Sequence, residues 1–302
     1  MAGYDLLVRF WGVRGSHPVP GQSTLRYGGN TSCVEVRARD RILILDAGTG
    51  IINLGSQLTQ EARNGPLDLT ILFSHTHHDH IQGLPFFAPA YRPDCQLRLY
   101  GPRTLSEDLH QVLTHAMSPH YSPIGLDELK ARIFSQNITE NDVLVFDEGT
   151  PEPNVLREHE FKNDGRKQVV VRILRSYGHP KVGVFIFKVE VNGKSVVYAT
   201  DTEGYVGADT RLIEFARGAN LLIHDAQYTP EEYLDNGFPK QGFGHSTYEM
   251  AARVAREAQV ENLVLFHHEP SHDDDKIADM VAKTRELFPN ADAGTEGKEF
   301  TF

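Results

Sequence analysis

The stretch SHTHHDH, residues 74–80, places four histidines and one aspartate in seven consecutive positions. Imidazole and carboxylate are ligands that zinc favours, and each zinc ion takes about four ligands. A single turn cannot direct four side chains at one ion, so the spacing indicates two metal ions. His75 and His77 are then assigned to the first ion. Asp79 and His80 are assigned to the second, and each ion still needs ligands from distant parts of the chain.

Candidates for the missing ligands stand where other apolar runs end. The runs RILIL, TILF, SVVYAT, NLLI and NLVLF predict strands, and each ends at or next to a polar residue. Those residues are Asp46, His75, Asp201, His224 and His267. Two similar halves that end strands in this way would present the residues along one edge of paired sheets. With His179, which follows a further strand, we predict that Asp201 and His267 complete the two metal sites. Asp201 is expected to bind both ions. Residues 74–80 are called the metal loop, and Asp46 is expected to hold this loop in place by hydrogen bonding.

Length and composition indicate a globular protein. The chain has 302 residues, of which 40% are hydrophobic and 24% charged, and we interpret residues 1–302 as one domain. The net charge of −11 disfavours a broad electrostatic attraction to nucleic acid. Cys33 and Cys95 are the only cysteines, which excludes a disulfide framework and a cysteine zinc cluster. No signal peptide or membrane span is evident, so we expect a cytoplasmic protein.

The segment 105–165 differs in composition from the rest of the chain. It carries twelve Asp or Glu against four Lys or Arg, a charge of −8, and several prolines. The spacing of apolar residues predicts helices at 105–117 and 126–133. We interpret this segment as an acidic, helical insertion beside the cleft, which acts as a lid or as a wall that limits substrate size.

The motif H-x-H-x-D-H at 75–80, followed in order by His179, Asp201 and His267, resembles that of the metallo-β-lactamase-fold hydrolases. The resemblance covers nearly the whole chain and implies an α/β fold, an αββα sandwich with a dinuclear metal site along one sheet edge. It assigns His75, His77 and His179 to one ion, Asp79, His80 and His267 to the other, and Asp201 to both. Zinc is the expected metal, with manganese or iron as alternatives. His78 and His268 match variable positions, and we expect them to be exposed or to lie behind the ligands.

A second pair of motifs, LLIHDAQY and GFGHSTYEM, resembles the ribonuclease Z and phosphodiesterase branch of this superfamily. The resemblance implies that Asp225 orients His245, which protonates the leaving alkoxide or contacts the phosphate. The familiar form of the motif has glutamate at the acidic position, so the shorter aspartate departs from it. Asp79 joins Asp225 and His245 among the predicted catalytic residues. The alternative interpretation of GHST is a helix N-terminus capped by Ser246 or Thr247.

The glycine-rich stretch RYGGNTSC supplies three candidate substrate residues, Asn30, Thr31 and Ser32. A plain tight turn explains the same sequence equally well. A nucleobase would need an aromatic or apolar pocket, and the sequence offers candidates for it. They are Phe86, Phe87, Tyr91, Tyr121 and Tyr177.

Two neighbouring metal ions activate a bridging hydroxide and clamp a phosphoryl group, which suits hydrolysis of a phosphodiester. In the family that the chain resembles, ribonuclease Z binds tRNA with a protruding basic arm. Segment 105–165 occupies the corresponding place in this sequence, but it is acidic and would repel RNA. We therefore predict a phosphoric diester hydrolase acting on a small cyclic phosphodiester, such as a cyclic nucleotide. Long nucleic acid and membrane partners are not expected, and the resemblance favours a homodimer.

Other functions are compatible with the same ligands. A tRNA 3′-processing endonuclease of the ribonuclease Z type is the first alternative. A glyoxalase-II-like thioesterase is the second, although it has no use for the Asp225 and His245 pair. A metal-stabilised binding module without activity would be expected to lack one ligand, and none is missing.

Overall fold

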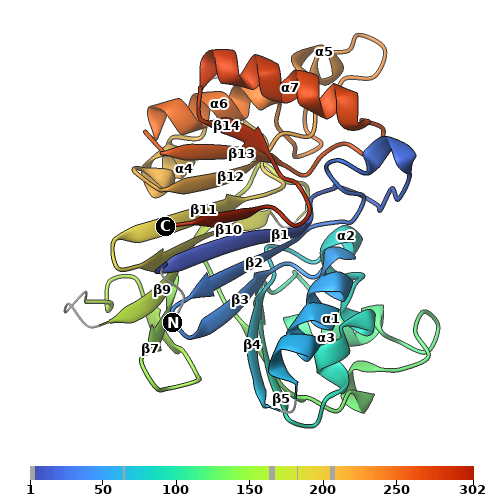
Figure 1. Ribbon diagram of the computed structural model, residues 1–302, viewed down its shortest axis with the longest axis vertical. Helices are drawn as coiled ribbons and strands as arrows, with labels where there is room; N and C mark the ends of the chain where they lie inside the picture. Colours follow the sequence, from blue (N-terminus) through green and yellow to red (C-terminus); the bar gives the residue numbers. More distant parts are fainter. Residues whose placement is uncertain (1–3, 64, 163–166, 182, 205–207) are drawn as a thin grey trace.

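The computed structural model describes the chain except residues 1–3, 64, 163–166, 182 and 205–207, and it is built around two mixed β-sheets (Figure 1). The first sheet has the strand order β15-β1-β2-β3-β4-β5-β6, and the second has the order β14-β13-β12-β11-β10-β9-β7-β8. The strands of the first sheet are β1 (Leu6–Gly12), β2 (Cys33–Ala38), β3 (Arg41–Leu45), β4 (Leu67–Leu72), β5 (Cys95–Gly101), β6 (Arg132–Asn137) and β15 (Glu299–Thr301). Those of the second are β7 (Asp142–Asp147), β8 (Asn154–Arg157), β9 (Gln168–Ser176), β10 (Val184–Val191), β11 (Lys194–Ala199), β12 (Leu221–Asp225), β13 (Asn262–Phe266) and β14 (Ala291–Ala293).

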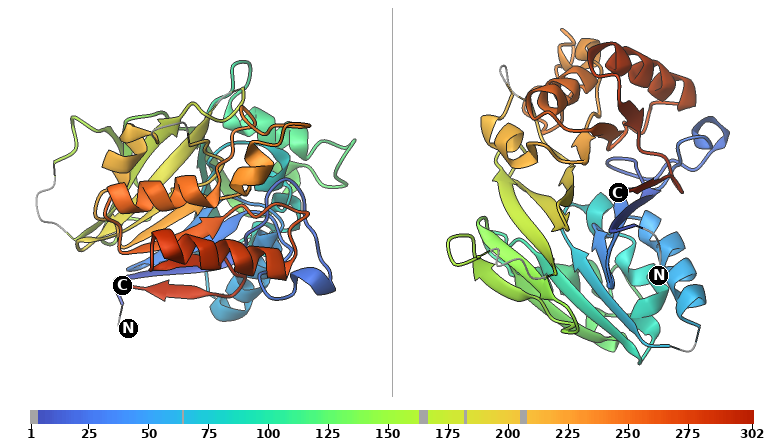
Figure 2. Two further views of the ribbon diagram at one scale, coloured as in Figure 1. Left: turned by 90° about the horizontal axis from the view of Figure 1, so that it is seen from above. Right: turned by 60° about the vertical axis from the view of Figure 1, so that its left-hand side comes forward.

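Helices cover the outer face of each sheet, so the molecule has four layers (Figure 2). They are α1 (Gly50–Ala62), α2 (His78–Ile81), α3 (Leu109–Ala116), α4 (Thr210–Ala216), α5 (Pro230–Tyr233), α6 (Tyr248–Glu257) and α7 (Asp274–Leu287), with short 3-10 turns between them. Helices α1 and α3 pack on the first sheet, and α4, α6 and α7 pack on the second. The predicted αββα sandwich is therefore the observed arrangement.

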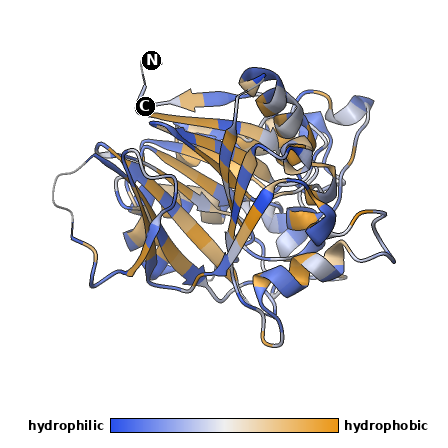
Figure 3. Ribbon diagram, turned by 90° about the horizontal axis from the view of Figure 1, so that it is seen from below, coloured by the Kyte–Doolittle hydropathy of each residue, from blue (hydrophilic) through white to orange (hydrophobic). Residues whose placement is uncertain are grey.

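Alternating side chains on the strands build the layers. On β11, Val196 and Tyr198 point into the core between the two sheets, whereas Val197 and Ala199 point into the core beneath the helices. This period of two is what a strand buried on both faces requires. The hydrophobic residues accordingly run along the strands in the middle of the molecule (Figure 3).

The direction of the strands explains where polar residues gather. Strands β3 to β6 are parallel, and so are β11 to β14. Strand β9 is antiparallel to β10, which is antiparallel to β11, so β9 runs in the same direction as β11. Residues that follow β3, β4, β9, β11, β12 and β13 therefore lie at the carboxyl edge of their sheet, where a parallel sheet presents its ligands.

The segment 105–165 does not have the predicted helical structure. Its first helix is present as α3, but the second predicted helix is only the 3-10 turn Leu126–Glu128. The chain then forms β6, which pairs with β5, and β7, which pairs with β8 and β9. Strand pairing has overridden helical spacing here. Strands β6, β7 and β8 of the segment belong to the two sheets, whereas α3 packs on the outer face of the first sheet.

Among the described residues, no helix combines the length and the apolar character needed to cross a bilayer.

Candidate active site

His75, His77 and His179 form the first of two adjoining clusters. One ring nitrogen from each lies within 4.8 Å of the others. His77 Nδ1 and His179 Nε2 are 2.9 Å apart, although 102 residues separate them in the chain. His75 is fully buried and its Nε2 has no hydrogen-bond partner. A buried polar atom without a partner is costly, and a cation held by the three histidines would satisfy it.

Asp79, His80, Asp201 and His267 form the second cluster, and all four are buried. His80 Nε2 lies 3.3 Å from Asp79 Oδ2, and His267 Nε2 lies 3.1 Å from the same oxygen. His80 Nε2 also has no hydrogen-bond partner. Two imidazoles and two carboxylates around one point are a donor set suited to zinc, manganese or iron.

Asp201 lies between the two clusters. Its Oδ1 is 3.2 Å from His80 Nε2 and 3.3 Å from His267 Nε2. Its Oδ2 is 3.6 Å from His75 Nε2 and 3.9 Å from His179 Nε2. One oxygen thus faces each cluster, which is the placement that the predicted bridging role requires. The structure brings together all seven residues that the sequence nominated.

The protonation states of His75, His179 and Asp201 suit bound cations. Burial lowers the pKa of His75 well below its ordinary value, and burial also lowers the pKa of His179 to about 4. Both rings are therefore neutral at pH 7, the form that donates a lone pair to a metal. Burial raises the pKa of a carboxyl group, but His267 and His80 hold the pKa of Asp201 well below its usual range. Asp201 therefore stays ionised.

Asp46 braces the metal loop, as predicted. Its carboxylate accepts hydrogen bonds from the Ser74 N–H and the Ser74 hydroxyl, both at 2.7 Å. It also pairs with His80 Nδ1 at 2.8 Å and accepts from the Tyr198 hydroxyl at 2.8 Å. A carboxylate behind a ligating histidine fixes the orientation of its ring, so His80 Nε2 is aimed into the second cluster.

Three of the strand-end residues have left-handed backbone conformations. The φ angles are 63° at Asp46, 48° at Asp201 and 61° at His267. Such conformations are uncommon outside glycine and cost on the order of 1–3 kcal/mol each. All three occur where a strand stops and a side chain turns into the clusters, so the strain coincides with the candidate site.

Two further contacts reach the second cluster. The Ser16 N–H donates to Asp79 Oδ2 at 2.8 Å, and Gln227 Oε1 lies 3.0 Å from His267 Nδ1. Gln227 stands two residues after Asp225 at the end of β12, so the same strand-end pattern could have indicated it. Ser16 follows Gly15, where a Cβ would lie 2.4 Å from the His267 ring. The close approach at Gly15 is what brings the Ser16 N–H to the cluster.

Asp225 and His245 form the predicted pair. His245 Nδ1 lies 2.7 Å from Asp225 Oδ2, even though aspartate replaces the longer glutamate. The His245 ring stacks on His267 with centroids 4.9 Å apart. Burial alone would lower the pKa of His245, but Asp225, assisted by Asp201 and Asp79, raises it to about 9. His245 therefore carries a proton at neutral pH and presents its Nε2 away from Asp225.

The helix-cap interpretation of GHST also holds. The Thr247 hydroxyl accepts from the Met250 N–H at 3.3 Å and caps α6. Ser246 instead uses its N–H to bind Asp225 Oδ1 at 2.8 Å. The two interpretations coexist because His245 precedes the cap residue Thr247 by two positions and lies outside the helix.

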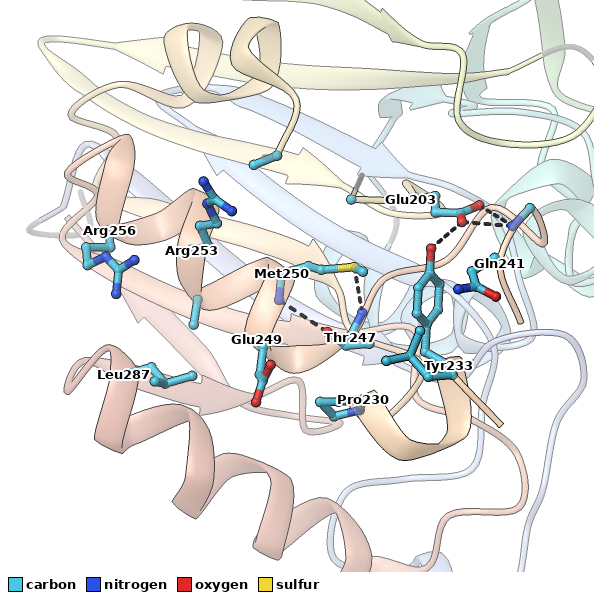
Figure 4. Close-up of a pocket in the computed structure, with 15 residues that line it drawn as sticks. Glu203, Pro230, Tyr233, Gln241, Thr247, Glu249, Met250, Arg253, Arg256 and Leu287 are labelled. Carbon is cyan, nitrogen blue, oxygen red and sulfur yellow. Dashed lines mark hydrogen bonds between the residues drawn. The ribbon is translucent and has the colours of Figure 1, made fainter. Parts of the chain in front are cut away.

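Glu203, which the sequence did not single out, holds the loop that leads to His245. Its carboxylate accepts from the Gly242 N–H at 2.8 and 3.0 Å and from the Gly244 N–H at 3.0 Å. The Tyr233 hydroxyl donates to it at 2.5 Å (Figure 4). Figure 4 shows the contact between Tyr233 and Glu203 at the edge of a pocket beside α5 and α6, and none of the seven predicted ligands lines that pocket. Glu203 thus connects the end of β11 to the position of His245.

The candidate substrate residues Asn30, Thr31 and Ser32 have structural roles instead. Thr31 and Ser32 are fully buried, and the Thr31 hydroxyl accepts from the Thr49 N–H at 2.8 Å. Asn30 donates to Glu296 through its backbone N–H and its side-chain amide. As the plain-turn interpretation suggested, their polar groups bind the protein itself. The structure does not support a substrate-facing role for Thr31 or Ser32.

Other sequence candidates divide by exposure. His78 is exposed, and His268 is buried behind the ligands, where its Nε2 lies 3.0 Å from the Gly294 carbonyl oxygen. Phe87 is fully buried in the core, so it cannot line a base pocket. Phe86 and Tyr121 are exposed.

Comparison with known proteins decides the family. A model described as a beta-lactamase superfamily domain matches residues 41–268, about three quarters of the chain. The protein belongs to the β-lactamase superfamily. Within this superfamily, the ribonuclease Z of Synechococcus sp. (strain WH7803) is 27% identical over 296 residues, covering 86% of this chain and 87% of that protein.

Solved structures agree on the fold. The metallo-β-lactamase-fold protein YhfI from Bacillus subtilis matches with a TM-score of 0.66 and 19% identity, covering 98% of this chain and 99% of that one. The short form of human tRNase Z matches with a TM-score of 0.61 and 20% identity, covering 98% of both chains. The predicted metallo-β-lactamase fold is confirmed. The similarity to ribonuclease Z proteins agrees with the predicted branch and with the prediction of a metal-dependent hydrolase.

Proposed function

We propose that this protein is an endonuclease of the ribonuclease Z type, which hydrolyses a phosphodiester bond at the 3′ side of an RNA such as a tRNA precursor. The observation that carries the proposal is the Asp225–His245 pair, 2.7 Å apart, set against His267 and His179 of the metal clusters. Similarity to ribonuclease Z proteins over most of the chain supports RNA as the substrate.

The side chains divide the chemistry between them. Bound to the two clusters, divalent cations would supply an activated water and neutralise charge on the phosphoryl group. His245, protonated and oriented by Asp225, is placed to donate a proton from Nε2 to the leaving alkoxide, which is a poor leaving group without it. Gln227 and Asp46 hold the rings of His267 and His80 in their orientations.

A small cyclic phosphodiester, the substrate favoured by the sequence, is the second candidate. The specific observation that favours it is the negative charge of the chain. The chain carries −11 overall and −8 in segment 105–165, which is acidic where ribonuclease Z would need a basic arm. Cationic contacts with phosphates normally provide much of the affinity for RNA. A compact substrate that reaches only the metal clusters does not depend on them.

One substrate panel separates the candidates. Protein loaded with zinc or manganese is incubated with a tRNA precursor, 2′,3′- and 3′,5′-cyclic nucleotides, bis(p-nitrophenyl) phosphate and a glutathione thioester. Cleavage of the tRNA precursor at a single 3′ site is the expected result. Turnover of cyclic nucleotides without RNA cleavage would favour the second candidate, and turnover of the thioester alone would overturn both.

The His245→Ala variant tests the proton donor. We expect bound metal to be retained and turnover of the best substrate to fall at least ~100-fold, the usual scale for a lost general acid. His78→Ala is the matched control, because His78 is an exposed histidine of the same motif that belongs to neither cluster. Equal activity of the two variants would leave His245 without a chemical role.

A further inference from the structure

Two exposed phenylalanines stand on the loop that leads to His245. Phe238 and Phe243 are 62% and 41% exposed, and their ring centroids are 5.6 Å apart. Burial of such rings normally stabilises a protein, so a neighbouring pair left in solvent indicates a surface with a binding role. We call residues 238–243 the aromatic loop.

A cation lies against both rings. The Lys240 ammonium is 4.1 Å from the Phe238 ring centroid and 5.7 Å from that of Phe243. It is also 5.9 Å from the ring of Tyr228. The aromatic loop therefore combines two π faces with a positive charge, in a chain whose net charge is −11. Grooves that bind single-stranded nucleic acid use the same combination.

The aromatic loop is positioned next to the proton donor. Tyr228, which contacts Lys240, has its ring centroid 6.1 Å from that of His245. Phe243 precedes His245 by two residues, and the intervening Gly244 packs on His179, where a Cβ would lie 2.3 Å from Nδ1. The aromatic loop therefore lies next to His245, where the leaving group would receive its proton.

The loop is also held in place. Glu203 binds the N–H groups of Gly242 and Gly244 at one end. Asp235 Oδ1 accepts from the Phe238 N–H at 2.9 Å at the other end. Because the backbone is anchored at both ends, less of the loop has to be ordered when a ligand arrives.

We propose that Phe238, Lys240 and Phe243 bind the nucleotide on the leaving-group side of the scissile bond, with its base on the rings and a phosphate at the ammonium. The proposal rests on the proposed function, since it takes a nucleotide as the substrate. Stacking on rings does not depend on which base is present, so the contact sets affinity rather than sequence preference.

The first test measures binding and does not depend on turnover. Metal-loaded protein is titrated with adenosine 5′-monophosphate and with ribose 5-phosphate, which lacks the base. Wild-type protein is expected to bind the nucleotide more tightly by on the order of tenfold, and Phe238→Ala and Phe243→Ala should each reduce that preference. Phe134→Ala is the matched control, because Phe134 is 51% exposed but lies on β6 at the end of the first sheet. An unchanged preference in both loop variants would overturn the proposal.

The second test places the base. Two short RNA substrates are compared, one complete and one without the base on the leaving side. The complete RNA should have the lower KM with wild-type protein, and the two should be equal with Phe238→Ala. Lys240→Met should weaken binding of both RNAs and reduce the salt dependence. If wild-type protein cleaves neither RNA, the proposed function fails, while the nucleotide titration still decides the role of the aromatic loop.

Discussion

The two halves of the molecule supply the candidate metal site in different ways. The first half places four ligands within the six residues 75–80, in the loop after β4 and the short helix α2 that follows it. The second half supplies one ligand after each of three strands, namely His179, Asp201 and His267. The four ligands of the first half are close together in the sequence. The three ligands of the second half come together only because strands β9 to β13 pair in one sheet.

Neither half can form the candidate metal site without the other. The loop can present imidazoles and a carboxylate on its own, but it cannot complete either cluster. Asp201 joins the halves, because one of its oxygens faces the His80 side and the other faces the His75 side. Its left-handed backbone at the end of β11 is what directs the side chain there.

The largest effect is expected from loss of the Asp201 carboxylate, which faces both clusters. Asp201→Asn removes the charge that faces both clusters, so metal content should fall below about two ions per chain and activity should drop to the level of chelator-treated protein. Metal analysis and turnover measure the two effects. Asp209→Asn is the control, because it removes one charge while keeping an N-cap for α4. Full activity and metal content in Asp201→Asn would show that the two halves do not share a bridging ligand.

A smaller effect is expected from loosening the loop of the first half. Asp46→Asn keeps the shape of the side chain but loses the carboxylate that orients His80, so metal affinity or activity should fall by about 10–100-fold. Tyr198→Phe removes only one donor to Asp46 and should cost about 1 kcal/mol in the free energy of unfolding, with metal affinity nearly unchanged. Metal titration and urea unfolding of both variants test this. Equal metal affinity in both would mean that the loop holds its geometry without Asp46.

The smallest effect is expected from a matched pair of glycines in the second half. Gly242 and Gly244 both have positive φ, 84° and 90°, so alanine should cost about 1 kcal/mol of stability at Gly242 and more at Gly244. Only at Gly244 would the Cβ meet His179, whereas Gly242 has open space around it. Gly244→Ala should therefore also lower turnover by about tenfold through displacement of His179, and Gly242→Ala should not. Similar turnover in the two variants would show that His179 tolerates the shift.

The segment 105–165 shows where local patterns mislead. Apolar spacing at 126–133 matched a helix, but an open edge of β5 was available and the chain forms β6 against it. Each residue of β6 gains a pairing that no local pattern encodes. The lid or wall inferred from the acidic composition stays a prediction, and Met117 and Tyr121 of this segment line a pocket together with His78 of the metal motif.

The sequence by itself determined the metal loop and the strand-end ligands, because fixed spacing and strand ends place particular atoms at one sheet edge. The pairing of Asp225 with His245 came from the resemblance of its motifs to those of a known family. Only the tertiary structure decided that Thr31 and Ser32 are buried, that Glu203 holds the loop before His245, and that Phe238 and Phe243 stay exposed beside Lys240. The physical reason is the separation, along the sequence, of the residues that interact. Ligand geometry within one turn depends on neighbouring residues, whereas burial and loop contacts depend on which distant segments the two sheets bring together.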